Sequence, residues 1–366
     1  MEQLSNKQVG VLISLSIISL KLFIFPSLVS RYAGNNCYIS VLISMAIEFL
    51  FILLILWVMK KNPGMSLFEI LQSRFGKVIP RIIAGILTIY FLGKAIVSMK
   101  ELQNFLVQLL FEHISWWKFV VPLFGILIYI LNKSLRTYAR SVQFFYWFIF
   151  VGAATTLILP VQEIQLVNLL PIFSNGVLPI LKGSFYTSFH FIDFMVLLIL
   201  MGRVKYTKET SKSIIKYSIF TYVFILVYFI FYVGLFGNIL VNEGLLVSDI
   251  PLYSNYPATN GRLEWLSMII WTMVLIYQSA LMMISARESF SYATTLKNNA
   301  VISIIISFIV AICLYIAYLN YAGVIRLITT TIFNVSLLAF IVILMGFLLL
   351  CCAGGKEHEI KVKKNG

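Results

Sequence analysis

Long apolar runs alternate with short polar segments along almost the whole chain. A helix needs about 20 apolar residues to cross the roughly 30 Å hydrocarbon core of a bilayer, and most of the runs approach or exceed that length. The pattern therefore predicts an all-α polytopic membrane protein with ten transmembrane helices. The predicted spans lie at about residues 9–30, 37–59, 79–101, 119–131, 142–160, 180–202, 214–240, 263–286, 299–320 and 331–352.

The polar segment between the second and third spans has a pattern of its own. After a Pro-Gly turn, apolar residues recur among polar ones at Leu67, Phe68, Ile70, Leu71 and Phe75. This helical spacing predicts a short amphipathic helix that lies on the inner surface of the membrane.

The composition favours one membrane domain over residues 1–366. Of these residues, 60% are apolar and only 11% are charged, which is more apolar surface than a chain in water could hide. The loops are short and contain no low-complexity linker. The first span has no small-residue cleavage pattern at its end, so we expect it to be retained rather than removed as a signal peptide.

The basic residues orient the predicted spans. With the N-terminus placed in the cytoplasm, 20 of the 28 Lys and Arg residues fall on the inner side and 5 on the outer side. This bias follows the positive-inside rule and predicts that both termini are cytoplasmic, including a tail over residues 353–366. The net charge of +14 is then explained by topology and by contact with the lipid bilayer, and we expect no nucleic-acid partner.

The first span combines a charge with a helix breaker. Lys21 lies about 18 Å from the inner end of its helix at 1.5 Å per residue, which is close to the midplane. Pro26 removes a backbone hydrogen bond and clashes with the carbonyl of Leu22, so the helix should kink or break between them. Backbone groups freed at this depth must face protein, water or a ligand. Three roles are open for Lys21: an ion pair within the protein, direct contact with a ligand or ion, and snorkelling to an interface.

The sixth span is unusually polar in its first half, which contains Thr187, His190 and Asp193. His190 and Asp193 are three residues apart and are therefore expected on one face of a helix. Asp193 is again close to the middle of its span. For His190 both a satisfied buried imidazole and a ligand contact are open.

Two further charges fall inside predicted spans, Glu48 in the second and Lys94 in the third. Together with Lys21 and Asp193 they sum to zero. Because an unpaired buried charge costs several kcal/mol, this balance predicts that the four pair with one another. Lys100 and Glu101, near the outer end of the third span, are expected to have no special role.

Interrupted polar segments thus fall in span one and span six of ten. This is a five-plus-five arrangement with an inverted second half, and the predicted repeats cover about residues 9–160 and 180–352. Broken helices at matching places in inverted repeats point to a binding site near the bilayer midplane. We therefore expect a ligand cavity or charge network formed by Lys21, Pro26, Glu48, Lys94, Thr187, His190 and Asp193.

The sequence gives no indication of an enzyme or a cofactor. We find no nucleophile motif, phosphate-binding loop or dinucleotide fingerprint. The four cysteines are too scattered for a disulfide framework, and the histidines have no other metal-ligand residues at zinc spacing. We therefore expect no catalytic site and no metal site.

Two arrangements of residues in the first part of the chain carry a family resemblance. They are Phe25-Pro26-Ser27 with Ala33-Gly34 and Tyr38-Ile39-Ser40, and Pro63-Gly64 with Ser66 to Ile70. With the ten predicted spans and the chain length, they make the sequence similar to the GerAB-type spore germination proteins. These are the permease-like B subunits of nutrient germinant receptors, within the amino acid–polyamine–organocation superfamily.

The resemblance implies a leucine-transporter-like fold with helices one and six broken. It also implies a place in the spore inner membrane, and assembly with an A-type membrane subunit and a C-type lipoprotein. The implied role is to bind a small nutrient such as an amino acid and to signal germination. A secondary amino acid transporter driven by protons or sodium needs the same cavity and stays open, as does a structural or ion-conducting subunit.

One departure from the superfamily concerns the first span. Transporters of this kind commonly break the helix at a glycine-rich stretch whose N–H groups hold the substrate carboxylate. Here no glycine occurs between Gly10 and Gly34, and Lys21 occupies the region. Either Lys21 supplies the positive charge for an anionic group of the ligand, or an internal ion pair fills the site.

Overall fold

The computed structural model of the chain describes residues 3–110, 115–158, 160–173, 176–237, 250, 264–296 and 299–353. Every regular element in these ranges is helical. Apart from its first residue, the predicted tail over 353–366 lies outside the described residues.

The helices follow the predicted apolar runs, with short 3₁₀ segments (η) between some of them. The first part of the chain forms α1 (Asn6–Ile18), η1 (Ser19–Leu22), α2 (Phe25–Ala33), η2 (Gly34–Asn36), α3 (Cys37–Lys61), α4 (Leu67–Phe75), α5 (Val78–Leu110), α6 (Trp116–Leu131), α7 (Leu135–Ile158), η3 (Val161–Glu163) and η4 (Leu166–Leu169). The second part forms α8 (Val177–Tyr186), η5 (Ser188–Phe191), α9 (Met195–Leu200), η6 (Met201–Arg203), α10 (Lys208–Phe236), α12 (Glu264–Thr294), α13 (Asn299–Leu319), α14 (Tyr321–Ile328) and α15 (Thr331–Ala353).

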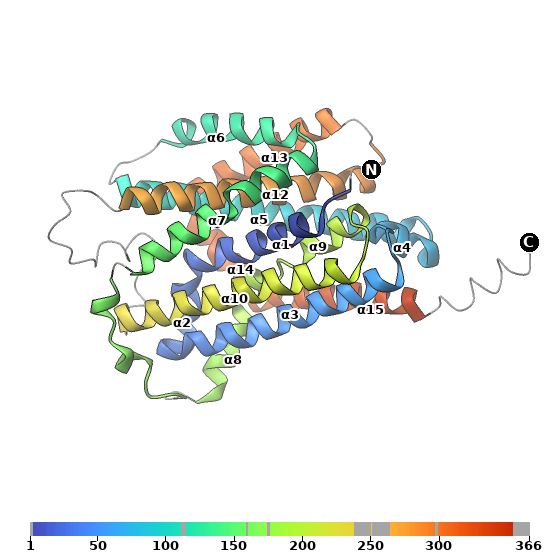
Figure 1. Ribbon diagram of the computed structural model, residues 1–366. Coiled ribbons are helices and arrows are strands. Elements are labelled where there is room, and N and C mark those ends of the chain that lie inside the picture. Colours follow the sequence, from blue (N-terminus) through green and yellow to red (C-terminus); the bar gives the residue numbers. More distant parts are fainter. Residues whose placement is uncertain are drawn as a thin grey trace, which may run out of the picture.

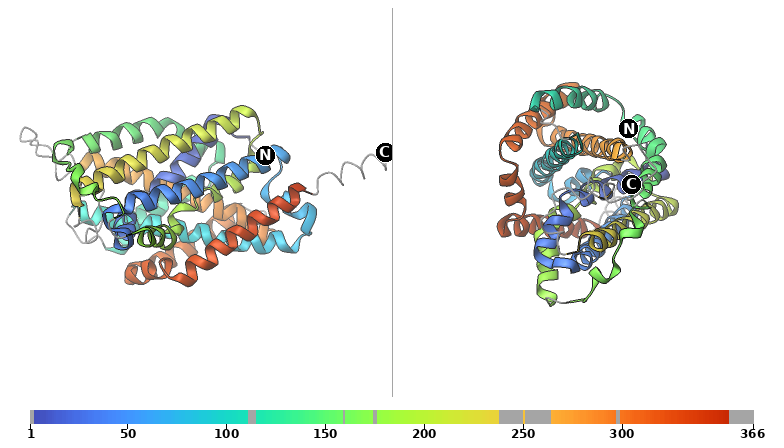
Figure 2. Two further views of the ribbon diagram at one scale, coloured as in Figure 1. Left: turned by 90° about the horizontal axis from the view of Figure 1, so that it is seen from below. Right: turned by 90° about the vertical axis from the view of Figure 1, so that its left-hand side faces the viewer.

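The helices lie side by side in an elongated bundle, and the start of α1 and the end of α15 are at the same end of it (Figure 1). The end-on view in Figure 2 shows the helices grouped around the long axis of the bundle. Helix α1 packs against α7, α10 and α12, and its residues from Gln8 to Ile18 are all buried. A helix that is apolar on all sides belongs in the interior, which is where the fold places it.

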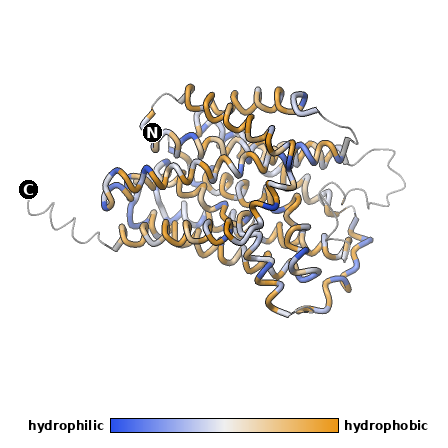
Figure 3. The backbone as a smooth tube through the Cα atoms, turned by 180° about the vertical axis from the view of Figure 1, so that it is seen from behind, coloured by the Kyte–Doolittle hydropathy of each residue, from blue (hydrophilic) through white to orange (hydrophobic). Residues whose placement is uncertain are grey.

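The outside of the bundle is apolar. Large side chains such as Ile89, Phe144 and Ile332 are 72%, 79% and 81% exposed, and Figure 3 shows hydrophobic residues along most of the helices. By length and composition, seven helices of the described residues can cross a membrane, or eight if the bent pair of α8 and the segment after it counts as one. The chain is therefore a multi-pass membrane protein. The number of ten spans and the boundaries of the two repeats stay predictions.

The first span is broken where the sequence predicted it. Helix α1 ends at Ile18 and continues as the 3₁₀ segment η1. The helical geometry is then interrupted until α2 begins at Phe25. Pro26 lies in the first turn of α2, where its missing N–H costs nothing. The freed carbonyl of Leu22 accepts a hydrogen bond of 2.9 Å from the Tyr232 hydroxyl on α10.

The sixth span is broken as well. Its helix axis bends by 69° between α8 and the segment Ser188–Arg203, and the Thr187 hydroxyl bonds back to the Gly183 carbonyl at 2.6 Å. The expected shared helix face of His190 and Asp193 is wrong, because the chain leaves α-helical geometry at Thr187. His190 lies in η5, and Asp193 follows in the irregular stretch before α9.

The predicted amphipathic helix is α4. Ser66 caps its first turn in a reciprocal pair with Glu69. Its apolar face packs on protein: Phe68 stacks on Tyr292 of α12 at 4.3 Å between ring centroids, and Phe75 contacts Phe347 of α15 at 4.8 Å. The helix therefore ties the end of α12 to the end of α15.

We expect the replacement Tyr232→Phe to destabilise the protein by about 1–3 kcal/mol, because it leaves the buried Leu22 carbonyl without this partner. Melting of the purified protein in detergent would measure the change. The same replacement at Tyr129, which is 64% exposed, is the control and should change little. An unaltered melting temperature for Tyr232→Phe would show that the break in the first span does not depend on this bond.

Candidate functional site

The two broken spans and two continuous helices bring four charged side chains together. Lys21 comes from η1, Asp193 from the stretch before α9, Glu48 from α3 and Lys94 from α5. Their side chains are at most 1% exposed. We call these four residues the charge cluster.

Asp193 is the centre of the charge cluster. Its Oδ2 lies 2.5 Å from the Lys21 Nζ and its Oδ1 lies 2.9 Å from the Lys94 Nζ. Glu48 contacts both broken spans. Its Oε2 is 3.3 Å from the Lys21 Nζ, and its Oε1 accepts the backbone N–H of Asp193 at 3.0 Å. The predicted mutual pairing is confirmed, and Lys21 has both Asp193 and Glu48 as partners.

The helix breaks explain why these groups can meet. The Lys21 ammonium also donates to the Ile17 carbonyl at 2.9 Å, and so satisfies a backbone acceptor near the C-terminal end of α1. In the other broken span the Asp193 N–H has no intrahelical partner and is taken up by Glu48. Each break therefore supplies a backbone group that binds the cluster directly.

Aromatic rings enclose the two lysines. The Lys21 Nζ lies 5.0 Å from the ring centroid of Phe191, and the Lys94 Nζ lies 4.7 Å from that of Phe189. Both distances are within the range of cation–π attraction. The Tyr90 hydroxyl donates to the Ile192 carbonyl at 2.9 Å, which anchors this aromatic segment to α5.

His190 lies between the two phenylalanines in the sequence but outside the ion pairs. Its ring is 1% exposed and packs on Phe25 of α2 with 5.0 Å between ring centroids. Neither ring nitrogen has a hydrogen-bond partner among the described residues. Since buried polar atoms are normally paired, His190 has unused hydrogen-bonding capacity.

The other two expected site residues have local roles in this conformation. Pro26 starts α2, and the Thr187 hydroxyl is used by its own helix. Four cavities in the described part of the chain are lined by other residues, and none of these four contains a member of the charge cluster. The sequence left two arrangements open for Lys21, a contact with an anionic group of the ligand and an internal ion pair. The structure has the internal ion pair.

Glu101 is a buried residue that the sequence analysis did not single out. Its side chain is fully buried. Its carboxylate accepts a hydrogen bond from the Tyr321 hydroxyl of α14. Its place near the outer end of a predicted span indicated no special role, and its partner Tyr321 comes from a helix far along the chain.

The charge cluster is not arranged as a metal site. No group of three or more His, Cys, Asp or Glu side chains in the described ranges is close enough to hold a metal ion. The two carboxylates of the cluster are instead neutralised by two ammonium groups. This arrangement can exchange ion-pair partners with a polar ligand.

We expect Lys21→Met or Asp193→Asn alone to cost about 3–5 kcal/mol, because each leaves an uncompensated buried charge. The double variant keeps Lys94 and Glu48, which balance, so it should be less destabilised than either single variant. Denaturation in mixed micelles would measure the three free energies of unfolding. The exposed pair of Glu209 and Lys212 provides a control cycle that should show little coupling. Additive damage at Lys21 and Asp193 would contradict a direct pair.

Comparison with known proteins gives the fold independently. The structure is similar to a Na⁺-coupled sialic acid symporter in a substrate-bound outward-open state, with a TM-score of 0.57 and 12% identity over 89% of this chain and 76% of that one. It is also similar to a variant of the Eremococcus coleocola manganese transporter, with a TM-score of 0.55 and 12% identity over 95% of this chain and 78% of that one. At this identity the similarity establishes the leucine-transporter fold alone.

Comparison of sequences gives the family. Spore germination protein GerQB of Bacillus cereus is 22% identical over 84% of both chains. Spore germination protein YndE of Bacillus subtilis is 20% identical over 49% of both chains, so this match spans about half of that relative. The family model described as spore germination protein matches residues 3–322. The chain therefore belongs to the spore germination protein family.

Proposed function

We propose that this protein is the membrane subunit of a spore nutrient germinant receptor. In this proposal it binds a small nutrient between the broken helices and passes the signal on to germination. Family membership supports the role in spores, and one observation supports the site. Both broken spans contribute to a sealed charge cluster, and beside it the two ring nitrogens of His190 have no hydrogen-bond partner among the described residues.

The balance of the cluster limits the ligand. Lys21 and Lys94 offset Glu48 and Asp193, and all four are sealed from water. A ligand with a net charge would leave an uncompensated charge in this environment, which costs several kcal/mol. A zwitterion such as an amino acid keeps the sum at zero, because its carboxylate can take a lysine while its ammonium takes a carboxylate.

Binding of such a ligand would have to rearrange the ion pairs. Lys21 holds Asp193 and Glu48 at once, and these three residues belong to η1, the second break and α3. A ligand that takes Lys21 would release the two broken spans from each other. A ligand shifts a conformational equilibrium only through different contacts in the two states, and the exchange of these pairs supplies that difference.

The wider setting is part of the same proposal. The protein lies in the spore inner membrane with both termini in the cytoplasm, and it assembles with an A-type membrane subunit and a C-type lipoprotein. It forms one domain, built from two inverted repeats, and catalyses no reaction. The bias of basic residues to one side and the family support this arrangement.

The alternative is a secondary amino acid transporter driven by protons or sodium. The likeness in fold to a Na⁺-coupled symporter favours it. The internal ion pairs favour the receptor, because exchange of the Lys21–Asp193 pair with a ligand would by itself change the contacts between the two broken spans. Uptake of a radiolabelled amino acid into vesicles that contain the purified protein separates the two functions.

We expect spores without this gene to lose their response to one nutrient in a panel of amino acids. Restoring the gene should restore the response. Germination followed by the fall in optical density measures it, in a strain without other receptors for that nutrient. An unchanged response in that strain would count against the receptor, and vesicle uptake would then support the transporter.

His190→Phe should separate binding from folding. It removes two buried nitrogens without partners, so the melting temperature should stay the same or rise. If His190 contacts the ligand, the nutrient concentration for half-maximal germination should rise about tenfold, the value of one good hydrogen bond. Ser218→Ala, which removes another buried hydroxyl without a partner, is the control and should respond normally. A normal response of His190→Phe would exclude His190 from the binding site.

A further inference from the structure

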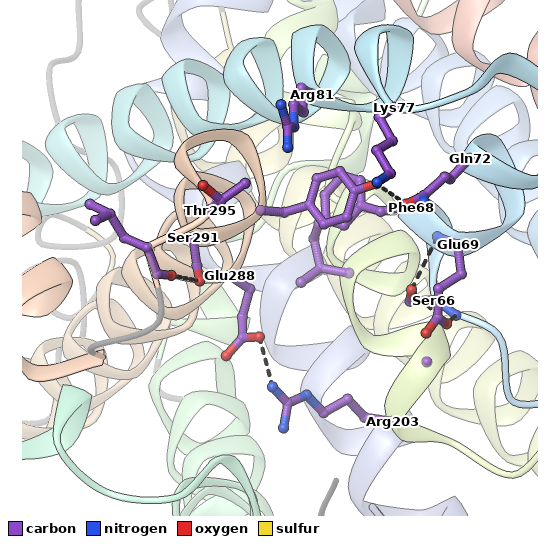
Figure 4. Close-up of a pocket in the computed structure, with 14 residues that line it drawn as sticks. Ser66, Phe68, Glu69, Gln72, Lys77, Arg81, Arg203, Glu288, Ser291 and Thr295 are labelled. Atoms are coloured by element: carbon purple, nitrogen blue, oxygen red, sulfur yellow. Dashed lines mark hydrogen bonds and ion pairs between the residues drawn. The ribbon is translucent and has the colours of Figure 1, made fainter.

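A second polar site lies at the end of the bundle where α1 begins. It is a cavity of about 450 Å³ between α4, η6, the start of α5 and the end of α12 (Figure 4). This volume is in the range of small-molecule sites, roughly 300–1,000 Å³. The charge cluster contributes nothing to its lining, so the cavity is separate from the site described above.

Two basic side chains at the cavity have no acidic partner. Lys77, just before α5, and Arg81, in its first turn, project toward the cavity (Figure 4), and both are exposed. Neither forms an ion pair with any residue that the structure describes, whereas Arg203 across the cavity pairs with Glu288 at 2.7 Å. Lys77 and Arg81 are therefore available to an anion from outside the chain.

The acidic residues at the cavity are already in use. Glu288 also lies 3.3 Å from a guanidinium nitrogen of Arg287, so two arginines share one carboxylate. Glu69 accepts the backbone N–H and the hydroxyl of Ser66 at 2.7 and 2.8 Å, which caps α4. The cavity thus keeps an excess of positive charge.

The walls of the cavity are held in place by close packing. A Cβ on Gly202 would lie 2.7 Å from the Cβ and 2.8 Å from the Cα of Ser66, so the start of α4 rests directly on the backbone of η6. On the other wall the Tyr292 hydroxyl donates to the Gln72 side chain at 2.9 Å. The walls of the cavity are therefore formed by helices that pack directly on one another.

We propose that this cavity binds a phosphate group. Arginine presents paired N–H donors that match phosphate oxygens, and lysine adds a mobile positive charge. Ile199 and Leu296 line part of the cavity and suit the apolar part of an amphiphile. The source of the phosphate is either the headgroup of an anionic lipid from the leaflet at this end or a free phosphate compound, and basic pockets between membrane helices are suited to such headgroups.

The test uses the full-length protein in a neutral detergent. Lipid retention is measured by native mass spectrometry with phosphatidylglycerol and, as the headgroup control, phosphatidylcholine. Inorganic phosphate forms the second arm, measured by its effect on the melting temperature. The double variant Lys77→Gln/Arg81→Gln is compared with Lys60→Gln/Lys61→Gln, which removes the same charge from exposed residues at the end of α3 that do not line the cavity.

We expect the wild type to prefer phosphatidylglycerol. Because each basic residue near an anionic lipid contributes about fivefold, Lys77→Gln/Arg81→Gln should weaken retention about 25-fold, and Lys60→Gln/Lys61→Gln should weaken it little. If inorganic phosphate raises the melting temperature and Lys77→Gln/Arg81→Gln abolishes the effect, the source is free phosphate. Equal losses in the two double variants, equal retention of both lipids, or no effect of either ligand would overturn the proposal.

Discussion

Four charges are sealed inside an apolar bundle, and the rest of the structure depends on how they satisfy one another. The ammonium groups of Lys21 and Lys94 both reach Asp193, and Glu48 completes the set. At this depth no water can replace a lost partner, so removing one charge costs far more than removing a balanced pair. The cluster therefore holds the two broken spans against α3 and α5 in one defined arrangement.

The backbone at the breaks and the charge cluster stabilise each other. Breaking a helix inside a membrane frees carbonyls and N–H groups that lipid cannot satisfy. Here Lys21 takes the carbonyl of Ile17, Tyr232 takes that of Leu22, and Glu48 takes the N–H of Asp193. These side chains thus satisfy backbone groups that the breaks leave unpaired, and the breaks in turn allow the charged side chains to approach one another.

The broken sixth span also connects the two proposed sites. Asp193 is followed by α9 and η6, which end at Arg203 beside the second cavity. The two residues are ten positions apart in the sequence, and the segment between them is buried for most of its length. The segment that carries Asp193 therefore leads directly to Arg203 and to the Gly202 backbone on which α4 rests.

The sequence by itself determined the membrane class, the breaks in spans one and six, and the balance of buried charge. These follow from properties that act locally: apolar length, the clash of Pro26 with the preceding turn, and the cost of an unpaired charge in hydrocarbon. Only the tertiary structure decided that Lys21 pairs with both Asp193 and Glu48, because helices 27 or more residues apart in sequence can be packed in many ways. The same limit explains Glu101, whose partner Tyr321 comes from a distant helix, and His190, which a break separates from the helical face expected for it. The cavity beside Lys77 and Arg81 is likewise made by four elements from across the chain, so no local pattern could show it.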